Sequence, residues 1–418
     1  MKDADTVIIG GGVAGCSLAS LLANRGRDVI LLERASIGGL LREIPFDSGY
    51  YCDSAPHLLF FDAETEPEVG ELFSTFTDLH HHDFYAATYP RGELSDPHHY
   101  PVSHANIDRW DDAERIRREL EAAPGRSDAA FFEEYLLDQV GETLYERYYR
   151  NYTEKHWGVS PTRITGDWFD FKIDVPDAER DFFGDGAYYP ADRYSDVLER
   201  MISDCDVVFD GASRLLTDGD RIEGIETEGG NVFTAKNYVS TVDPSHLLSD
   251  AGEPPKYRSM IVLGLHARMT ERLFPPHVDW GYFPNDYAFT RITDYGFTPQ
   301  SIPVEEAILT VEFPCFVDDD SWSRQDSWFE RYVLEFLADQ GIHADVIESN
   351  VRRAPRAYPL PVTEEIEKFE RLNTELASYE NMYNLGRTGS YEYIWIKDIV
   401  AQAYETRDEI EASVDQRR

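Results

Sequence analysis

The chain has 418 residues, of which 42% are hydrophobic and 13% aromatic, so it can bury a large core and is not intrinsically disordered. It carries 79 acidic and 39 basic residues, which gives a formal net charge of −40. That charge repels nucleic-acid phosphates and anionic membrane surfaces, and no run of 18 apolar residues is present. We therefore expect no nucleic-acid partner and no integral membrane protein.

The acidic residues are spread along the whole chain, and only seven of the basic residues are lysines. Such a surface stays hydrated at molar salt, where screening removes the repulsion between its carboxylates. This predicts a halophilic, salt-adapted protein, with an ordinary acidic protein as the alternative. The N-terminus enters a strand pattern without a basic, cleavable leader, which favours a cytoplasmic location. Four widely separated cysteines without a metal-ligand spacing are expected to be reduced, buried thiols: Cys16, Cys52, Cys205 and Cys315.

The first elements form a β-α-β unit. Residues 6–9 are a β-branched run that predicts a buried strand, and a glycine cluster follows it. A helix is predicted over 13–24 and a second strand over 28–33. This length is typical of a right-handed crossover between parallel strands.

The rest of the chain alternates between helical and strand-rich stretches. Helices are predicted over 107–123, 129–150, 193–204, 323–340, 363–378 and 397–411. The strand-rich stretches are a meander with a return strand over 206–242, a block over 258–315 and a last strand over 382–386. The charged residues 406–418 are expected to fray into a solvated tail.

The glycine cluster has the GxGxxG pattern of a dinucleotide site. Its glycines permit a tight turn and a close approach of the backbone to a pyrophosphate, and the N-terminus of the next helix offers N–H groups to the phosphates. An acidic residue ends the following strand, where it can accept both ribose hydroxyls of an adenosine. The predicted cofactor contacts in this unit are Gly10, Gly12, Val13, Ala14, Gly15 and Glu33.

A second glycine pair, Gly38-Gly39, follows the acidic residue and leaves room for a flavin dinucleotide. Another strand–glycine–helix pattern lies at the C-terminus. In these features the chain resembles the FAD-binding superfamily of UDP-galactopyranose mutase, amine oxidases, protoporphyrinogen oxidase and phytoene desaturases. The resemblance implies FAD and an α/β fold, with a GR2-type Rossmann-like FAD-binding domain, a helical cap and a β-rich substrate domain. It implies these further cofactor contacts: Arg34, Gly38, Gly39, Leu40, His57, Val208, Gly386, Arg387 and Asp398.

Several segments resemble those of the mutases in chain order. SAPHLLF (54–60) is similar to the segment whose histidine, here His57, packs against the flavin. NYTEKHWG (151–158) is similar to the motif whose rings, here Tyr152 and Trp157, hold the nucleotide base, although core packing is the alternative for both. FTRITDYGF (289–297) resembles the strand whose arginine, here Arg291, reaches the diphosphate. NLGRTGSYEYIW (384–395) resembles the closing motif, in which Tyr393 lies near the sugar.

The chain also departs from the mutase pattern. In DFFGDGAYYPADRY (181–194), Tyr194 fits a substrate-binding tyrosine, but the mobile-loop arginine is missing near Phe183 to Asp185. Arg180 or Arg193 would replace it only if the loop bends differently. The closing run Ile394-Trp395-Ile396-Lys397 is bulkier and less acidic than that of the mutases, and VSTVDP (239–244) resembles the oxidase and desaturase branch.

Two reactions therefore remain open. A mutase would isomerise a sugar nucleotide between pyranose and furanose on the reduced flavin, with His57, Arg291 and Tyr393 as catalytic residues. An oxidoreductase would oxidise a glycan, a lipid or an isoprenoid precursor. Both take a small-molecule substrate, a nucleotide sugar or a phosphorylated precursor. A flavin-binding protein without activity is the third alternative, and the sequence leaves oligomerisation open.

A metal site is not expected. His80-His81-His82-Asp83 and His98-His99 are interpreted as exposed loop runs, because consecutive residues do not face one ion. The predicted division is an FAD-binding domain from 1–90, 190–250 and 355–418, a helical cap over 91–189 and a β-rich substrate layer over 251–354.

Overall fold

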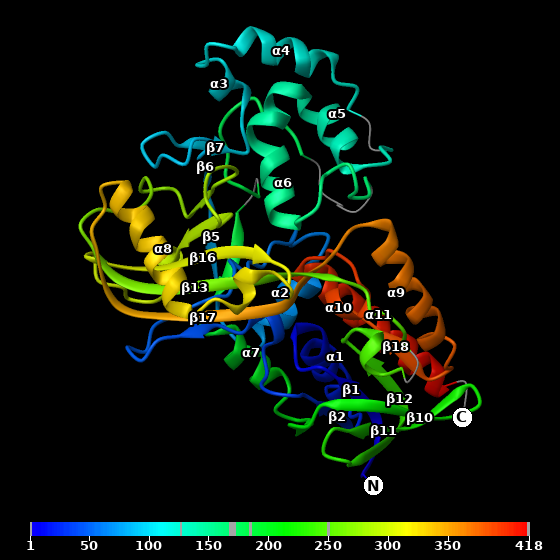
Figure 1. Cartoon of the computed structure of the whole chain (residues 1–418). Coiled ribbons are helices and arrows are strands. Elements are labelled where there is room, and N and C mark those ends of the chain that lie inside the picture. The colour runs from blue at the N-terminus through cyan, green and yellow to red at the C-terminus, as the bar shows by residue number, and fades with distance from the viewer. Residues whose placement is uncertain (1, 126–127, 167–172, 184–185, 249–250, 416–418) are drawn as a thin grey trace.

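A computed structural model describes residues 2–125, 128–166, 173–183, 186–248 and 251–415. From bottom to top, Figure 1 shows a sheet flanked by the first and last helices, a second sheet, and a cap of helices. This is the mixed α/β architecture that the sequence predicted.

The first sheet has the strand order β10-β11-β12-β1-β2-β9, and β18 also pairs with β12. Strands β12, β1, β2 and β9 are parallel to one another, as a β-α-β crossover requires. The strands are β1 (Lys2–Ile9), β2 (Val29–Leu32), β9 (Asp206–Val208), β10 (Ala212–Asp218), β11 (Arg221–Thr227), β12 (Val232–Ser240) and β18 (Met382–Asn384).

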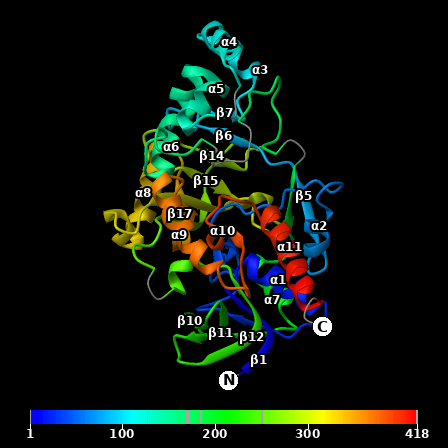
Figure 2. The ribbon, with the colours of Figure 1, turned by 90° about the vertical axis from the view of Figure 1, so that its right-hand side faces the viewer.

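Helices from both ends of the chain cover one face of this sheet. α1 (Val13–Ala23) is buried along almost its whole length, because α11 (Ile396–Asp415) packs against it. Both views place the red α11 beside the blue α1 (Figures 1 and 2). α2 (Pro67–Ser74) and α7 (Tyr194–Met201) extend this layer, and α9 (Thr363–Leu376) contributes Leu372 and Leu376 to the core on the opposite face.

The second sheet has the order β17-β13-β16-β15-β14-β6-β7 and is antiparallel except where β14 meets β6. Residues of α8 (Asp326–Asp339), among them Phe329 and Phe336, cover one of its faces. The strands are β6 (Ala86–Thr88), β7 (His98–Tyr100), β13 (Tyr257–Met269), β14 (Trp280–Tyr282), β15 (Arg291–Asp294), β16 (Glu306–Cys315) and β17 (Ala344–Pro359). Two small two-stranded sheets pair β3 (Ile44–Pro45) with β4 (Tyr51–Cys52) and β5 (Leu79–His82) with β8 (Ala187–Pro190).

The cap holds α3 (His104–Ile107), α4 (Ala113–Ala122), α5 (Phe132–Leu144) and α6 (Arg150–Trp157), with a π-helical turn over Tyr145–Tyr149 between the last two. The helix predicted over 129–150 is confirmed from Phe132 onward, but it is not a single regular helix and does not end at residue 150. Gly141, with φ of 73°, kinks α5, and the helical path then continues to the end of the NYTEKHWG motif. The helix predicted over 107–123 begins later, as α4 at Ala113, because Ile107 ends the separate short helix α3, which starts from the capping box at Ser103.

Other expectations also need correction. The tail predicted over 406–418 is helical as far as Asp415, because α11 continues along α1 and α2. His80–His82 lie in β5 and His98-His99 in β7, so neither run is a loop. Strand β17, which no sequence pattern predicted, crosses the boundary proposed at residue 354, and β6 joins the second sheet although it precedes residue 90. The division into three parts remains a prediction.

The expectations about membrane spans, metal sites and cysteines can be compared with the described residues. None of their helices is long and apolar enough to cross a membrane. No group of three or more His, Cys, Asp or Glu side chains among them is placed to hold a metal ion. The four cysteines are free thiols, and all but the half-buried Cys205 are buried.

Candidate active site

The glycine turn between β1 and α1 has no room for side chains. Gly10 has φ of 107°, and a Cβ there would lie 2.1 Å from Thr241 Oγ1. A Cβ on Gly15 would lie 2.0 Å from the carbonyl oxygen of Gly10, and one on Gly39 would lie 2.9 Å from the Cα of Gly12. Two glycine segments thus meet backbone to backbone, and the α1 N-terminus, with Val13 and Ala14 in its first turn, lies beside them. This is the geometry of a pyrophosphate cradle.

Glu33 directly follows β2, and its carboxylate is held beside the glycine turn. Its carboxylate accepts the backbone N–H of Gly11 at 2.8 Å and that of Ala35 at 2.8 Å. Its own backbone N–H donates to the carbonyl oxygen of Val208 at 3.0 Å. Arg34 instead forms an ion pair with Glu228 at 3.0 Å, and both side chains are more than half exposed.

The C-terminal segment closes on this cradle. Gly386 has φ of 83°, and a Cβ there would lie 2.7 Å from the Cβ of Ala14, so the two ends of the chain meet at α1. Asp398 caps the start of α11 by accepting the backbone N–H of Trp395 at 2.8 Å. Leu40 lies in the 3₁₀ turn Gly39–Leu41 beside the cradle.

His57 lies near three arginines. Burial, with the nearby charges of Arg387, Arg352 and Arg291, lowers the pKa of His57 to about 3. The ring is therefore neutral near pH 7, and its buried Nδ1 has no hydrogen-bond partner among the described residues. Tyr194 donates its hydroxyl to the His57 carbonyl oxygen at 2.8 Å.

Tyr194 itself is fully buried, between Phe73 and Tyr189. The prediction that it binds substrate is therefore corrected. The first turn of α7 lies inside the core around α1, so this tyrosine fixes the backbone at His57 and does not face a substrate.

Three neighbouring strands place Tyr282, Arg291 and Glu312 in one row. Tyr282 of β14 pairs in register with Arg291 of β15, which pairs with Glu312 of β16. Such cross-strand neighbours share one face of a sheet. Arg291 Nε donates to Glu312 Oε1 at 2.7 Å, and burial raises the pKa of that carboxyl. The pair fixes the guanidinium in place near the ring of Tyr282.

Aromatic rings surround this row. The Tyr152 and His156 rings lie one turn apart on α6 and stack at 5.5 Å with an angle of 10°, and Tyr152 meets Tyr282 edge-on at 5.6 Å. Tyr358 and Tyr393 stack at 5.6 Å, and Trp157 packs against both. The structure thus brings together four residues that the sequence analysis singled out: Tyr152, Trp157, Arg291 and Tyr393. Trp157 is only 4% exposed, so it supports the cluster from within.

Arg387 lies between this cluster and the cofactor cradle. Its guanidinium carbon is 5.4 Å from the ring centres of both Tyr358 and Tyr393, and its Nη2 donates to the carbonyl oxygen of Ile394 at 2.7 Å. It is thereby anchored between Tyr358, at the end of β17, and the later residues Tyr393 and Ile394 of the closing motif. The predicted cofactor contact therefore also borders the predicted substrate cluster.

The two arginines considered as replacements for the missing loop arginine are bonded to other groups. Arg180 forms an ion pair with Asp174 at 3.0 Å, and Arg193 donates to the carbonyl oxygen of Gly49 at 3.2 Å. Phe183 stacks on Phe60 at 4.9 Å, whereas residues 184 and 185 lie outside the described chain.

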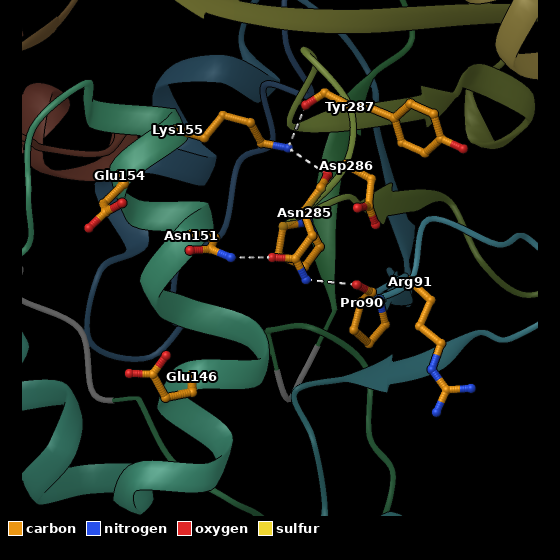
Figure 3. Close-up of a pocket in the computed structure, with 10 residues that line it drawn as sticks. Pro90, Arg91, Glu146, Asn151, Glu154, Lys155, Asn285, Asp286 and Tyr287 are labelled. Atoms are coloured by element: carbon orange, nitrogen blue, oxygen red, sulfur yellow. Dashed lines mark hydrogen bonds between the residues drawn. The ribbon is translucent and has the colours of Figure 1, made fainter.

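A separate pocket of about 910 Å³ lies on a neighbouring face of α6, beside loop 284–287. Figure 3 shows Lys155 reaching carbonyl oxygens of that loop and Asn151 bonded to Asn285. Its wall carries Glu146, Glu154 and Asp286, and none of the predicted site residues. We therefore do not assign the active site to this pocket.

Sequence reasoning missed several members of the site: His156, Tyr282, Glu312, Arg352 and Tyr358. His156 lies within the quoted NYTEKHWG motif and Tyr358 within AYPLP (357–361), so both could have been found. Tyr282 and Glu312 belong to the site only through strand register, which the sequence does not display.

Comparisons with known proteins agree with the fold. The model of the NAD(P)-binding Rossmann-like domain matches residues 8–76. A carotenoid 3,4-desaturase from Haloarcula japonica is 29% identical over 174 residues, which are 40% of this chain but only 31% of that relative. A reduced UDP-galactopyranose mutase structure superposes with a TM-score of 0.81 at 18% identity, covering 98% of this chain and 94% of that one. A cyclohexylamine oxidase from Brevibacterium oxydans gives 0.69 at 13% identity, covering 99% and 100%.

These superpositions confirm the predicted fold class and the resemblance to the mutase and amine oxidase fold. FAD is the cofactor that this fold and these residues fit. The side-chain-free meeting of Gly12 and Gly39 suits a pyrophosphate, Glu33 suits a ribose, and the contact of Gly386 with Ala14 brings the C-terminal segment to the same place.

Proposed function

We propose that the protein is an FAD-dependent enzyme that acts on a nucleoside-diphosphate sugar and exchanges its pyranose and furanose rings. The observation that carries this proposal is the row of Tyr282, Arg291 and Glu312 at the edge of an aromatic cluster. Stacking of a nucleobase on an aromatic ring contributes roughly 1–3 kcal/mol per base to binding, and an oriented guanidinium donates hydrogen bonds to a diphosphate.

The roles of the chain follow from this placement. Tyr152 would hold the base, Arg291 the diphosphate, and Tyr393 with His57 the sugar beside the flavin. Bound reduced FAD would supply the nucleophile for the sugar carbon. A departing dianion favours two arginines, and Arg387, which lies over the ring of Tyr358, supplies a second cation at the cluster.

An oxidoreductase is the second candidate, and one observation favours it. Phe60 stacks on Phe183 at 4.9 Å and meets Trp395 edge-on at 4.7 Å, which gives an apolar wall next to the closing motif. An apolar substrate would suit this wall better than a sugar would. The carotenoid 3,4-desaturase relative is consistent with it.

Incubation of the dithionite-reduced holoenzyme with UDP-galactopyranose and UDP-galactofuranose, analysed by chromatography, tests the proposal. We expect ring exchange that depends on reduction and that falls at least tenfold in R291K. Absence of exchange, combined with bleaching of the oxidised flavin by an apolar metabolite, would reject the mutase and support the oxidoreductase. A purified protein that takes up no FAD would reject both.

A further inference from the structure

Arg352 of β17 is a buried cation that no sequence motif identified. It is aligned with Val262 of β13, which is aligned with Glu312 of β16. The row of Tyr282, Arg291 and Glu312 therefore continues across two more strands to Arg352, and cross-strand neighbours in a row share one face of the sheet. Arg352 thus faces the same side as Arg291, three strands away.

Its surroundings place it beside the cofactor cradle. Nη2 of Arg352 donates to the carbonyl oxygen of Gly39 at 2.7 Å, and Gly39 is the residue that meets Gly12 backbone to backbone. The charge of Arg352 also acts on His57. The guanidinium accordingly lies between the expected pyrophosphate site and His57, which the proposed function places beside the flavin.

The remaining donors of this arginine are not used. Nε and Nη1 are shielded from solvent and have no hydrogen-bond partner among the described residues. A buried donor without an acceptor costs about 1–3 kcal/mol. The buried carboxylates of Asp53 and Glu43 lie near enough to favour the charged form, and the pKa of Arg352, lowered by burial to about 10, still leaves it charged at neutral pH.

We propose that Arg352 contacts the bound flavin and stabilises the negative charge that the cofactor gains on reduction. This inference rests on the proposed FAD site but not on the identity of the substrate. A fixed cation next to the ring makes the reduced form bind more tightly relative to the oxidised form, which raises the reduction potential.

The adjacent residue offers a matched control. Arg353 points to the opposite face of β17, where it donates to Asp326 Oδ1 at 2.7 Å and lies over the ring of Phe329. R352M and R353M therefore remove the same charge from the same strand, on the two sides of the sheet.

The experiment compares the holoenzymes of wild type, R352M and R353M. FAD uptake is measured first, and then the midpoint potential of the bound flavin against reference dyes. We expect R352M to weaken the binding of reduced relative to oxidised FAD about tenfold or more, a fall of about 30 mV for a two-electron couple. We expect R353M to match wild type.

A midpoint potential of the flavin in R352M equal to that in wild type would overturn the inference. This holds even if R352M lowers the melting temperature, because that alone is expected of an arginine that only offsets the charge of Asp53. An equal fall in both variants would overturn it as well, because the effect would then be one of net charge. If R352M does not fold, R352Q is measured against the same expectations. Failure of wild type to bind FAD would reject the proposed function itself.

Discussion

Arg291 is the residue on which substrate binding depends most strongly in this account. Its Nε is committed to Glu312, so the proposed contact with a diphosphate would fall to its terminal nitrogens. A lysine has one compact charge and cannot serve both partners. We expect R291K to weaken UDP binding about tenfold or more, because a hydrogen bond to a charged group contributes roughly 1.5–3 kcal/mol.

Titration calorimetry with UDP measures this loss. Arg324, which lies over Trp328 beside α8, provides the control R324K, for which no change is expected. Unchanged affinity in R291K would remove Arg291 from the substrate site.

His57 makes a prediction about pH. Its pKa is lowered to about 3, first by burial and then by three arginines, whereas an unfolded histidine titrates near 6.5. The unfolded chain therefore binds the proton first, and His57 destabilises the fold progressively as the pH falls from 6.5 towards 3. We expect no titration of this ring between pH 5 and 8 in NMR spectra, with H57N used for assignment. A midpoint near 6.5 would contradict the buried, cation-flanked placement.

At this scale the sequence predicted what lies inside contiguous motifs. His57, Tyr152 and Tyr393 could be proposed as site residues because each belongs to a short run with a recognisable pattern. Tyr282 and Arg352 were missed because their neighbours come from strands 9 to about 90 residues away, joined by sheet register alone. Tyr194 was misplaced because its motif indicates a turn and not which side of α7 is buried.

At the scale of elements, α6 is held by two cations. Arg258 of β13 donates to the carbonyl oxygens of Lys155 and His156 at 2.9 and 2.7 Å, which satisfies the last carbonyls of the helix. Lys155 donates from Nζ to carbonyl oxygens of the loop 283–289, which leads directly into the strand of Arg291. The orientation of Tyr152 and the position of Arg291 are thereby coupled.

We predict that K155M separates these two elements. It leaves the carbonyl oxygens of Phe283, Asn285, Tyr287 and Phe289 without this donor, so the free energy of unfolding should fall by about 3 kcal/mol, and UDP binding should weaken although Lys155 lies outside the substrate cluster. Urea unfolding and calorimetry measure the two effects. K236M, which removes an exposed ion pair with Asp5, should change neither by more than about 0.5 kcal/mol. Full stability in K155M would contradict this role.

The same lysine adds a pH dependence. Burial lowers its pKa to about 7, whereas the unfolded value is 10.5. Between these values the unfolded chain binds the extra proton, so the wild-type free energy of unfolding should rise with pH relative to K155M. If the free energies of unfolding of wild type and K155M change equally with pH from 7 to 10, the lowered pKa of Lys155 is contradicted.

Elements with a strong periodic pattern were predicted within a few residues, as in α8, α9 and α7. The misses have local causes. Gly141 breaks the pattern of α5 without a proline to signal it, and β17 mixes charged and apolar residues because both of its faces serve a purpose, one towards the cofactor cradle and one towards α8.

At the scale of the whole molecule, the net charge of −40 opposes folding at low salt. Self-repulsion falls as salt shortens the screening length from about 10 Å at 0.1 M to about 3 Å at 1 M. We predict that the melting temperature rises continuously from 0.1 M to 2 M KCl. A melting temperature that does not rise over this range would show an ordinary acidic protein without salt adaptation.

The order of the predicted segments along the chain indicated that the N-terminal and C-terminal segments form one site. In the structure, both ends of the polypeptide return to α1. Adjacent glycine and strand patterns at the two termini predicted this closure, and the contact of Gly386 with Ala14 provides it. The sequence could not reveal which face of the second sheet meets the cofactor, because that depends on packing between segments distant in the chain.

The most direct test is a crystal structure of the reduced protein with UDP bound. The account predicts FAD phosphates at the turn from Gly10 to Gly15, the uracil on the ring of Tyr152 and the diphosphate on Arg291. A diphosphate bound elsewhere, for example in the pocket beside Asn285, with Arg291 bonded only to Glu312, would contradict it.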